Sequence, residues 1–131
     1  MKHCNVRTLF GVFLLAIAAW GAPLLTDADF LAAQQKGKIT LYLYTAVGCP
    51  ECRYMKQKVF HDPAIAPLLA RDFVVVERDV NIDTLIDGFD YFGIPTLFLV
   101  APDGTLIEKV VGSRKAPLFA PILRNAQKVL R

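Results

Sequence analysis

Runs of apolar residues alternate with polar segments along most of the chain. Ile39–Thr45 and Phe73–Val80 are rich in β-branched and aromatic residues, and the apolar positions of the first run occupy both faces, as in a strand that is covered on two sides. Two more apolar runs within residues 96–111 are joined by the stretch PDG at 102–104, which is a hairpin signature. The pattern therefore predicts four strands, of which the last two pair antiparallel.

Capping signals and helical spacing mark two segments close to the first strand. Residues 26–37 are expected to form a short helix that Thr26 caps and Gly37 ends. Residues 51–60 are expected to form a second helix, which starts at a pair of cysteines. The first strand should therefore lie between two helices in the chain.

Three further helices are expected. Asp62 is the predicted N-cap and Pro63 the predicted first residue of one of them, and residues 83–93 carry a weaker helical pattern. Pro121 is compatible with the C-terminal helix only within its first turn, since proline lacks the N–H that a helix interior needs. The apolar residues of that helix share one face: Leu118, Phe119, Ile122, Leu123, Ala126 and Val129.

The order of the predicted elements indicates an α/β fold. The first two strands are connected through helices, so they should be parallel with a right-handed crossover, while the last two form a hairpin. A four-stranded mixed sheet flanked by helices on both faces is the economical packing of such elements. A chain of 131 residues has room for one such domain.

The N-terminus has the layout of a secretory signal peptide. Lys2 and Arg7 make a short basic segment, residues 9–20 are uncharged and apolar, and Ala19 and Gly21 are small residues suited to cleavage. We therefore expect residues 1–21 to direct export and residues 22–131 to form the domain; the alternative is an uncleaved N-terminal anchor. The other basic residues are scattered, so a nucleic-acid partner is not expected.

The remaining domain keeps two of the three cysteines, Cys49 and Cys52, on either side of Pro50 and Glu51. If the helix starts at this pair, Pro50 takes the first helical position, where no N–H is needed. The N–H groups of the first turn then point toward the Cys49 sulfur and, with the helix dipole, favour its thiolate. Cys49 should therefore attack a disulfide, and Cys52 should resolve the mixed disulfide that forms.

A zinc site, a copper(I) site and a structural disulfide are the alternatives to redox exchange. Zinc normally takes four protein ligands, and His61 at the far end of the predicted helix is the only histidine left in the domain. A copper(I) carrier with two thiolates would have Met55 as its only methionine nearby. A structural disulfide across so short a loop would constrain little chain. Redox exchange is the favoured interpretation, and metal transport remains an alternative.

Pro95 directly precedes an apolar strand, where a trans proline would fit poorly. A cis Ile94–Pro95 bond would make a tight turn and leave the backbone groups of Ile94 free, whereas an ordinary edge-strand proline is the alternative.

The stretches CPEC, GIPT, PDGT and VVGS, in this order, resemble the thioredoxin superfamily over essentially the whole predicted domain. The resemblance implies a thioredoxin fold with Cys49 as nucleophile and Cys52 as resolving thiol. Pro95 would be the cis-proline beside them, Ile94 would pair with the substrate backbone, and Gly112 would line the substrate groove. The segment 52–81, with its VF-DP stretch, resembles exported bacterial thioredoxin-like proteins, including the SoxW type and the C-terminal domain of DsbD.

Some positions depart from the general thioredoxin pattern. Leu43 stands where that pattern has a buried proton-transferring Asp, and Gly48 replaces the Trp before the pair. Glu51 is expected to act both as an exposed first-turn acid favoured by the helix dipole and as a negative charge that raises the pKa of Cys49. Glu77, on the second strand, is a candidate for the missing proton acceptor.

The expected function is therefore that of an exported, periplasmic thiol–disulfide oxidoreductase that reduces protein disulfides. It would need no cofactor besides its redox-active disulfide and would act as a monomer. The resemblance implies a membrane thiol donor of the DsbD or CcdA type. The alternatives are an oxidase or isomerase of the same fold and a copper carrier.

Overall fold

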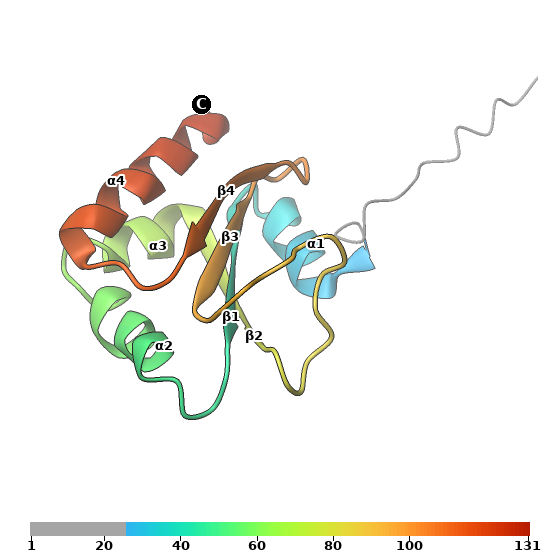
Figure 1. Cartoon of the computed structure of the whole chain (residues 1–131). Coiled ribbons are helices and arrows are strands. Elements are labelled where there is room, and N and C mark those ends of the chain that lie inside the picture. The colour runs from blue at the N-terminus through green and yellow to red at the C-terminus, as the bar shows by residue number, and fades with distance from the viewer. Residues whose placement is uncertain (1–25) are drawn as a thin grey trace, which may run out of the picture.

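The computed structural model describes residues 26–131 (Figure 1). The predicted signal segment, residues 1–21, lies outside the described residues. Within the described part of the chain, no helix is long and apolar enough to cross a membrane.

A four-stranded sheet forms the centre of the fold, in the order β2-β1-β3-β4. The strands are β1 (Ile39–Thr45), β2 (Phe73–Asp79), β3 (Thr96–Val100) and β4 (Leu106–Val111). The β1 and β2 strands are parallel, whereas β3 is antiparallel to both β1 and β4. The predicted mixed sheet, with a parallel first pair and a final hairpin, is confirmed.

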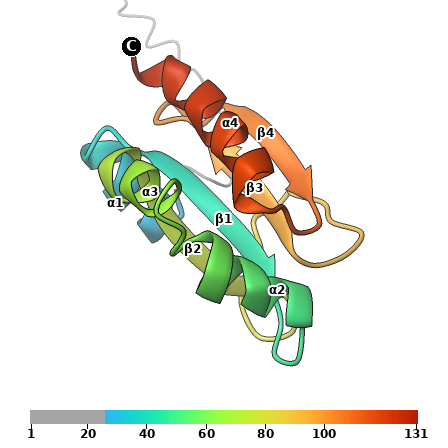
Figure 2. The same ribbon diagram turned by 90° about the vertical axis from the view of Figure 1, so that its left-hand side faces the viewer.

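Helices cover both faces of the sheet, with α2, α3 and α4 on one face and α1 on the other (Figures 1 and 2). The helices are α1 (Ala28–Gln35), α2 (Pro50–Tyr54), α3 (Ala66–Asp72) and α4 (Ala116–Ala126), with a π-helical turn η2 (Met55–Val59) after α2 and a 3₁₀ turn η3 (Gln127–Leu130) after α4. The predicted helices before β1, after the cysteine pair and at the C-terminus are therefore confirmed.

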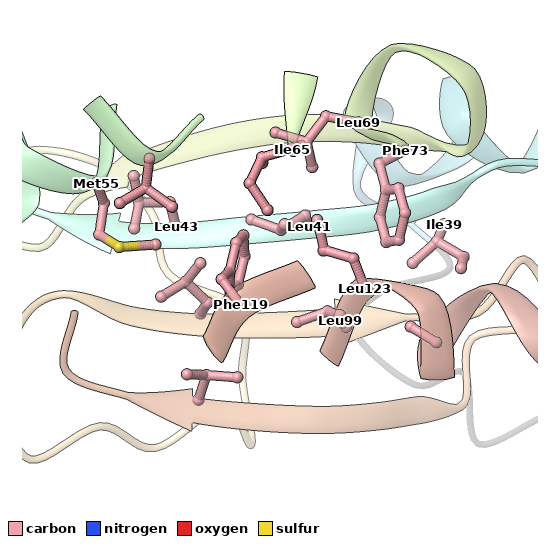
Figure 3. Close-up of a cluster of buried hydrophobic side chains, with 14 of the residues drawn as sticks. Ile39, Leu41, Leu43, Met55, Ile65, Leu69, Phe73, Leu99, Phe119 and Leu123 are labelled. Atoms are coloured by element: carbon pink, nitrogen blue, oxygen red, sulfur yellow. The ribbon is translucent and has the colours of Figure 1, made fainter. Parts of the chain in front are cut away.

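Both faces of β1 are buried, as its apolar residues on alternate sides predicted. Leu41 and Leu43 pack against Met55 of η2 and Phe119 of α4 in the larger core cluster (Figure 3). Burying a side chain of this kind contributes about 1.5–3 kcal/mol. The strand that leads to the cysteine pair is thus held rigidly at the centre of the domain.

The N-cap of α1 is Asp27, so the prediction that Thr26 caps this helix is wrong. The Asp27 backbone is extended, and its Oδ1 accepts a hydrogen bond of 2.9 Å from the Phe30 N–H. The end of the helix is as predicted, because Gly37 follows the last turn with φ of 64°, a conformation that glycine adopts without strain.

The helix predicted to begin at Asp62 and Pro63 begins instead at Ala66. The Asp62 Oδ1 accepts a 2.8 Å hydrogen bond from the Ala64 N–H, and its carbonyl accepts bonds from Ile65 and Ala66. The aspartate therefore makes a turn between η2 and α3 rather than a helix cap. Such side-chain bonds to the backbone two residues on compete with helix formation.

The weak helix predicted for residues 83–93 is absent, and turns occupy this segment. The Ile86 N–H donates to the Tyr44 hydroxyl at 2.9 Å, a partner from another element, and Gly88 has φ of 78°. Phe89 packs against Phe98 in the second core cluster. Tertiary contacts and a left-handed glycine thus replace the local helical pattern.

Pro121 lies inside α4, beyond the first turn, so the expectation about its position is wrong. Its missing N–H leaves the Pro117 carbonyl without the usual helical donor, but both prolines are exposed and water can satisfy that carbonyl. The predicted apolar face is confirmed at Phe119 and Leu123, which are buried, whereas Leu118 is exposed.

Candidate active site

The two cysteines lie at the start of α2, where Cys49 is the N-cap and Pro50 is the first helical residue. They form a disulfide, with 5.3 Å between their Cα atoms. Cys52 is only 1% exposed, while Cys49 is partly exposed. A partner molecule can therefore reach the Cys49 sulfur but not the Cys52 sulfur.

The first turn of α2 directs one backbone donor at the Cys49 sulfur and one at the Cys49 carbonyl. The Cys52 N–H donates to the Cys49 Sγ at 3.2 Å, and the Arg53 N–H donates to the Cys49 carbonyl at 3.1 Å. Once the disulfide is opened, the same N–H would stabilise a thiolate on Cys49. Pro50 takes the first helical position, as its place between the cysteines predicted.

Gly48 gives the turn that carries the chain from β1 into α2. Its φ is 81°, a left-handed conformation that residues with a side chain rarely adopt. Glycine at position 48 therefore suits the local backbone, and the tryptophan that the general thioredoxin pattern has at this position would be strained in this conformation.

The loop before β3 lies against the disulfide. The Ile94–Pro95 peptide bond is cis, and the Cys49 Sγ lies 3.9 Å from the Ile94 carbonyl oxygen. Gly112, directly after β4, has φ of 82° and donates its N–H to the Pro95 carbonyl at 2.8 Å. The structure thus brings Cys49, Ile94, Pro95 and Gly112 together from three distant parts of the sequence.

Glu51 lies in the first turn of α2 and is exposed, and its carboxylate accepts a hydrogen bond from the Ser113 hydroxyl. Sequence reasoning did not identify Ser113 as part of the site. The only available signal was its place directly after Gly112 in VVGS, and nothing there indicated which side chain it contacts. The next residue, Arg114, donates its N–H to the Met55 Sδ at 3.3 Å. This loop therefore contacts the redox helix, which comprises α2 and η2, twice.

Glu77 is paired with Leu43 in the register of β2 and β1, as its proposed role in place of the missing aspartate requires. Its carboxylate forms an ion pair with Lys56 Nζ at 3.2 Å, and both side chains are substantially exposed. The structure therefore places Glu77 in a surface ion pair between the edge strand and η2.

A second polar cluster, which sequence reasoning missed, joins α1 to the sheet. The Asp27 carboxylate accepts a 2.6 Å bond from the Tyr42 hydroxyl and a 2.8 Å bond from Arg78 Nη2, and Arg78 also binds Asp29 at 2.9 Å. Burial alone would raise the pKa of Asp27, but the bonds from Tyr42, Phe30 and Arg78 together hold it below its usual range. Burial raises the pKa of Tyr42, and its bond to Asp27 raises it further.

Three large apolar side chains are exposed in loops at the end of the sheet where β1 leads into the cysteine pair. Val47 precedes Cys49 by two residues, Phe92 precedes Ile94 by two, and Ile82 lies in the loop after β2. These loops follow β1, precede β3 and follow β2, so they lie at the same end of the sheet. Among the residues that the structure describes, no group of three or more His, Cys, Asp or Glu could hold a metal ion.

The family model of a thioredoxin-like domain matches residues 26–127, which is nearly the whole described part of the chain. The chain belongs to the thioredoxin-like family. A curated relative, the H-type thioredoxin of Brassica oleracea, is 30% identical over 99 residues, which cover 73% of this chain and 75% of that protein. The thioredoxin-like chain is therefore a thiol–disulfide oxidoreductase whose redox centre is the Cys49–Cys52 disulfide.

Similar proteins also include bacterial members of the thioredoxin-like family. The thiol:disulfide interchange protein DsbD 1 of Pseudomonas aeruginosa is 29% identical over 110 residues, which are 79% of this chain but 19% of that longer protein. The solution structure of a thioredoxin from Thermus thermophilus is 27% identical, with a TM-score of 0.59 over 70% of this chain and 75% of that one. The oxidised DsbD C-terminal domain of Neisseria meningitidis has a TM-score of 0.61 over 78% of this chain and 92% of that one. At 23% sequence identity, this similarity shows a shared fold.

Proposed function

We propose that this protein reduces disulfides in other proteins outside the cytoplasm and regains its electrons from a membrane thiol carrier of the DsbD or CcdA type. The observation that carries the proposal is the partly exposed Cys49 sulfur at the start of α2, 3.9 Å from the Ile94 carbonyl and joined to a buried Cys52. The signal-like segment 1–21 supports export, and the similarity to DsbD 1 supports a carrier of that type.

The proposed reaction has two exchange steps. The Cys49 thiolate attacks a substrate disulfide, so that a Cys49–substrate disulfide forms and one substrate thiolate leaves. The Cys52 thiolate then attacks the Cys49 sulfur, which releases the second substrate thiolate and leaves Cys49–Cys52 oxidised. The substrate gains two electrons and the pair loses two, and the membrane carrier restores the dithiol.

Substrate backbone is proposed to lie along the loop before β3. The edge at Ile94 faces the accessible sulfur, Pro95 holds this loop beside it, and the Gly112 N–H fixes the Pro95 carbonyl.

The direction of electron flow is proposed from the charge beside the pair. The Glu51 carboxylate lies in the same first turn as the cysteines, and a negative charge there disfavours the Cys49 thiolate and hence the reduced form. A couple with a less stable reduced form gives its electrons away more readily.

The reduction potential of the Cys49–Cys52 couple tests the proposed direction. The protein is equilibrated with dithiothreitol or glutathione buffers, and the fraction reduced is followed by thiol alkylation. We expect a value near that of thioredoxin, about −270 mV, and a value near −120 mV would instead indicate an oxidase. Cell fractionation of the tagged protein tests export separately, since recovery in the cytoplasm would contradict the proposed location.

A further inference from the structure

A groove of about 510 Å³ opens beside the redox helix, between α2 and the start of α4. Its lining residues come from these two helices and from the loop that joins β4 to α4: Glu51, Tyr54, Ser113, Arg114, Lys115 and Leu118. Glu51 directly precedes Cys52 in the chain, so the groove begins within the redox motif itself. Neither the exchange chemistry nor the loop at Ile94 uses it.

The groove lining carries net positive charge, because the two cations Arg114 and Lys115 outnumber the single carboxylate of Glu51. The Glu51 carboxylate accepts a hydrogen bond from the Ser113 hydroxyl, and the Arg114 Nη1 donates to the backbone carbonyls of Val111 and Ser113 at 3.0 and 2.9 Å. Neither Arg114 nor Lys115 forms an ion pair with any acid in the described part of the chain. Lys115 is exposed, so its ammonium group is available to an incoming carboxylate.

One wall of the groove is apolar. Leu118, in the first turn of α4, is 63% exposed, and Tyr54 of α2 is partly buried. An exposed leucine beside two cations suits a ligand that carries both an apolar and an acidic side chain. A bare anion would leave the leucine in water.

A substrate chain bonded to Cys49 is long enough to reach this groove. A substrate sulfur bonded to Cys49 fixes the substrate chain at the start of α2, and an extended chain covers about 3.3 Å per residue. Two or three residues flanking the substrate cysteine can therefore reach from Cys49 into a groove that starts at Glu51.

We propose that this groove binds the acidic flank of a protein substrate, with an Asp or Glu side chain against Lys115 and an apolar side chain against Leu118. This inference rests on the proposed function and names its substrate class: proteins whose reactive cysteine has a carboxylate two or three residues away. The groove is thus a specificity site separate from the Ile94 edge.

The test uses two peptide homodimers, each linked through a single cysteine, that differ only in Glu or Gln at the third residue from it. The Cys52→Ser protein is reduced and mixed with each dimer. Its Cys49 thiolate breaks the dimer disulfide, forms the mixed disulfide and releases one peptide thiolate, which is counted over time. This first step needs no turnover, so turnover by the wild-type protein tests the proposed function separately.

We expect the Glu peptide to react about two- to five-fold faster than the Gln peptide at low salt, the range that one exposed ion pair supplies. The preference should disappear in Lys115→Gln and reverse in Lys115→Glu, and 0.5 M salt should weaken it. Lys128→Gln is the matched control, because Lys128 is an exposed cation on η3 outside the groove lining, and it should keep the preference. Equal rates for the two peptides, or a preference that survives Lys115→Gln, would overturn the proposal.

Discussion

Replacing Asp27 by alanine should destabilise the domain far more than an ordinary surface substitution. The carboxylate caps α1 through the Phe30 N–H, accepts from the Tyr42 hydroxyl at 2.6 Å and pairs with Arg78 at 2.8 Å. Its side chain is only 13% exposed and that of Arg78 only 18%. Losing an N-cap costs about 1 kcal/mol, and leaving a buried donor without its acceptor costs about 1–3 kcal/mol. We therefore expect a loss of about 2–4 kcal/mol.

Urea unfolding of the oxidised protein at pH 7 measures this loss as a lower midpoint with an unchanged slope. Asp29→Ala is the matched control, since Asp29 is a second carboxylate on the same Arg78 but is 52% exposed. Its removal should cost about 0–1 kcal/mol, the range of surface ion pairs. If Asp27→Ala cost no more than Asp29→Ala, the argument that this cluster anchors α1 to the sheet would be refuted.

The same residue makes a prediction about pH. Because folding lowers the pKa of Asp27 from its ordinary value of 3.8, its ionised form stabilises the native state. That contribution is present in full above about pH 5 and is lost as the pH falls through the lower native value. The difference in unfolding free energy between the wild-type protein and Asp27→Asn should therefore shrink from pH 5 to pH 2. A constant difference over this range would contradict the assigned charge state.

Three other substitutions test the site and the core. Glu51→Gln should lower the pKa of the Cys49 thiol, since it removes a nearby negative charge, and thiolate absorbance at 240 nm against pH measures it; an unchanged pKa would show that the carboxylate does not act on the sulfur. Gly48→Ala should cost about 1–2 kcal/mol in urea unfolding because φ is 81° there, and a neutral result would mean that the turn relaxes freely. Phe119→Ala, at a side chain that is fully buried, should cost about 3–5 kcal/mol, and a loss below 1 kcal/mol would mean that the core refills the space.

The parts of the fold that were predictable are those whose signal is local. The strands carry their own β-branched and apolar patterns, and the PDG stretch defines the hairpin turn that leads into β4. The start of α2 was predictable because Pro50 fits a first helical position regardless of what packs against it. The spacing of Cys49 and Cys52 at this helix start then identifies them as a redox pair.

The errors come from contacts that the sequence does not display. Asp62 is a residue type that often serves as an N-cap, but its side chain closes a turn instead. A helix cap and this turn would use the same carboxylate oxygen as acceptor. Residues 83–93 have a weak helical pattern, but the Ile86 N–H, which would be a first-turn donor of that helix, donates instead to the Tyr44 hydroxyl, 42 residues away. Asp27 caps α1 in place of Thr26, and the Asp27 carboxylate also binds Arg78 of β2.

The loop from Gly112 to Arg114 shows why the site could be only partly derived from sequence. Gly112 bonds to the Pro95 carbonyl, Ser113 to the Glu51 carboxylate, and Arg114 to the Met55 sulfur. Three consecutive residues thus tie the loop before β3 to the redox helix, although these segments are some forty residues apart in the chain. A motif identifies the cysteines, but the relative position of the sulfur and the Ile94 edge depends on these cross-connections. Substitutions in this loop should therefore alter substrate reactivity at Cys49 without changing either cysteine.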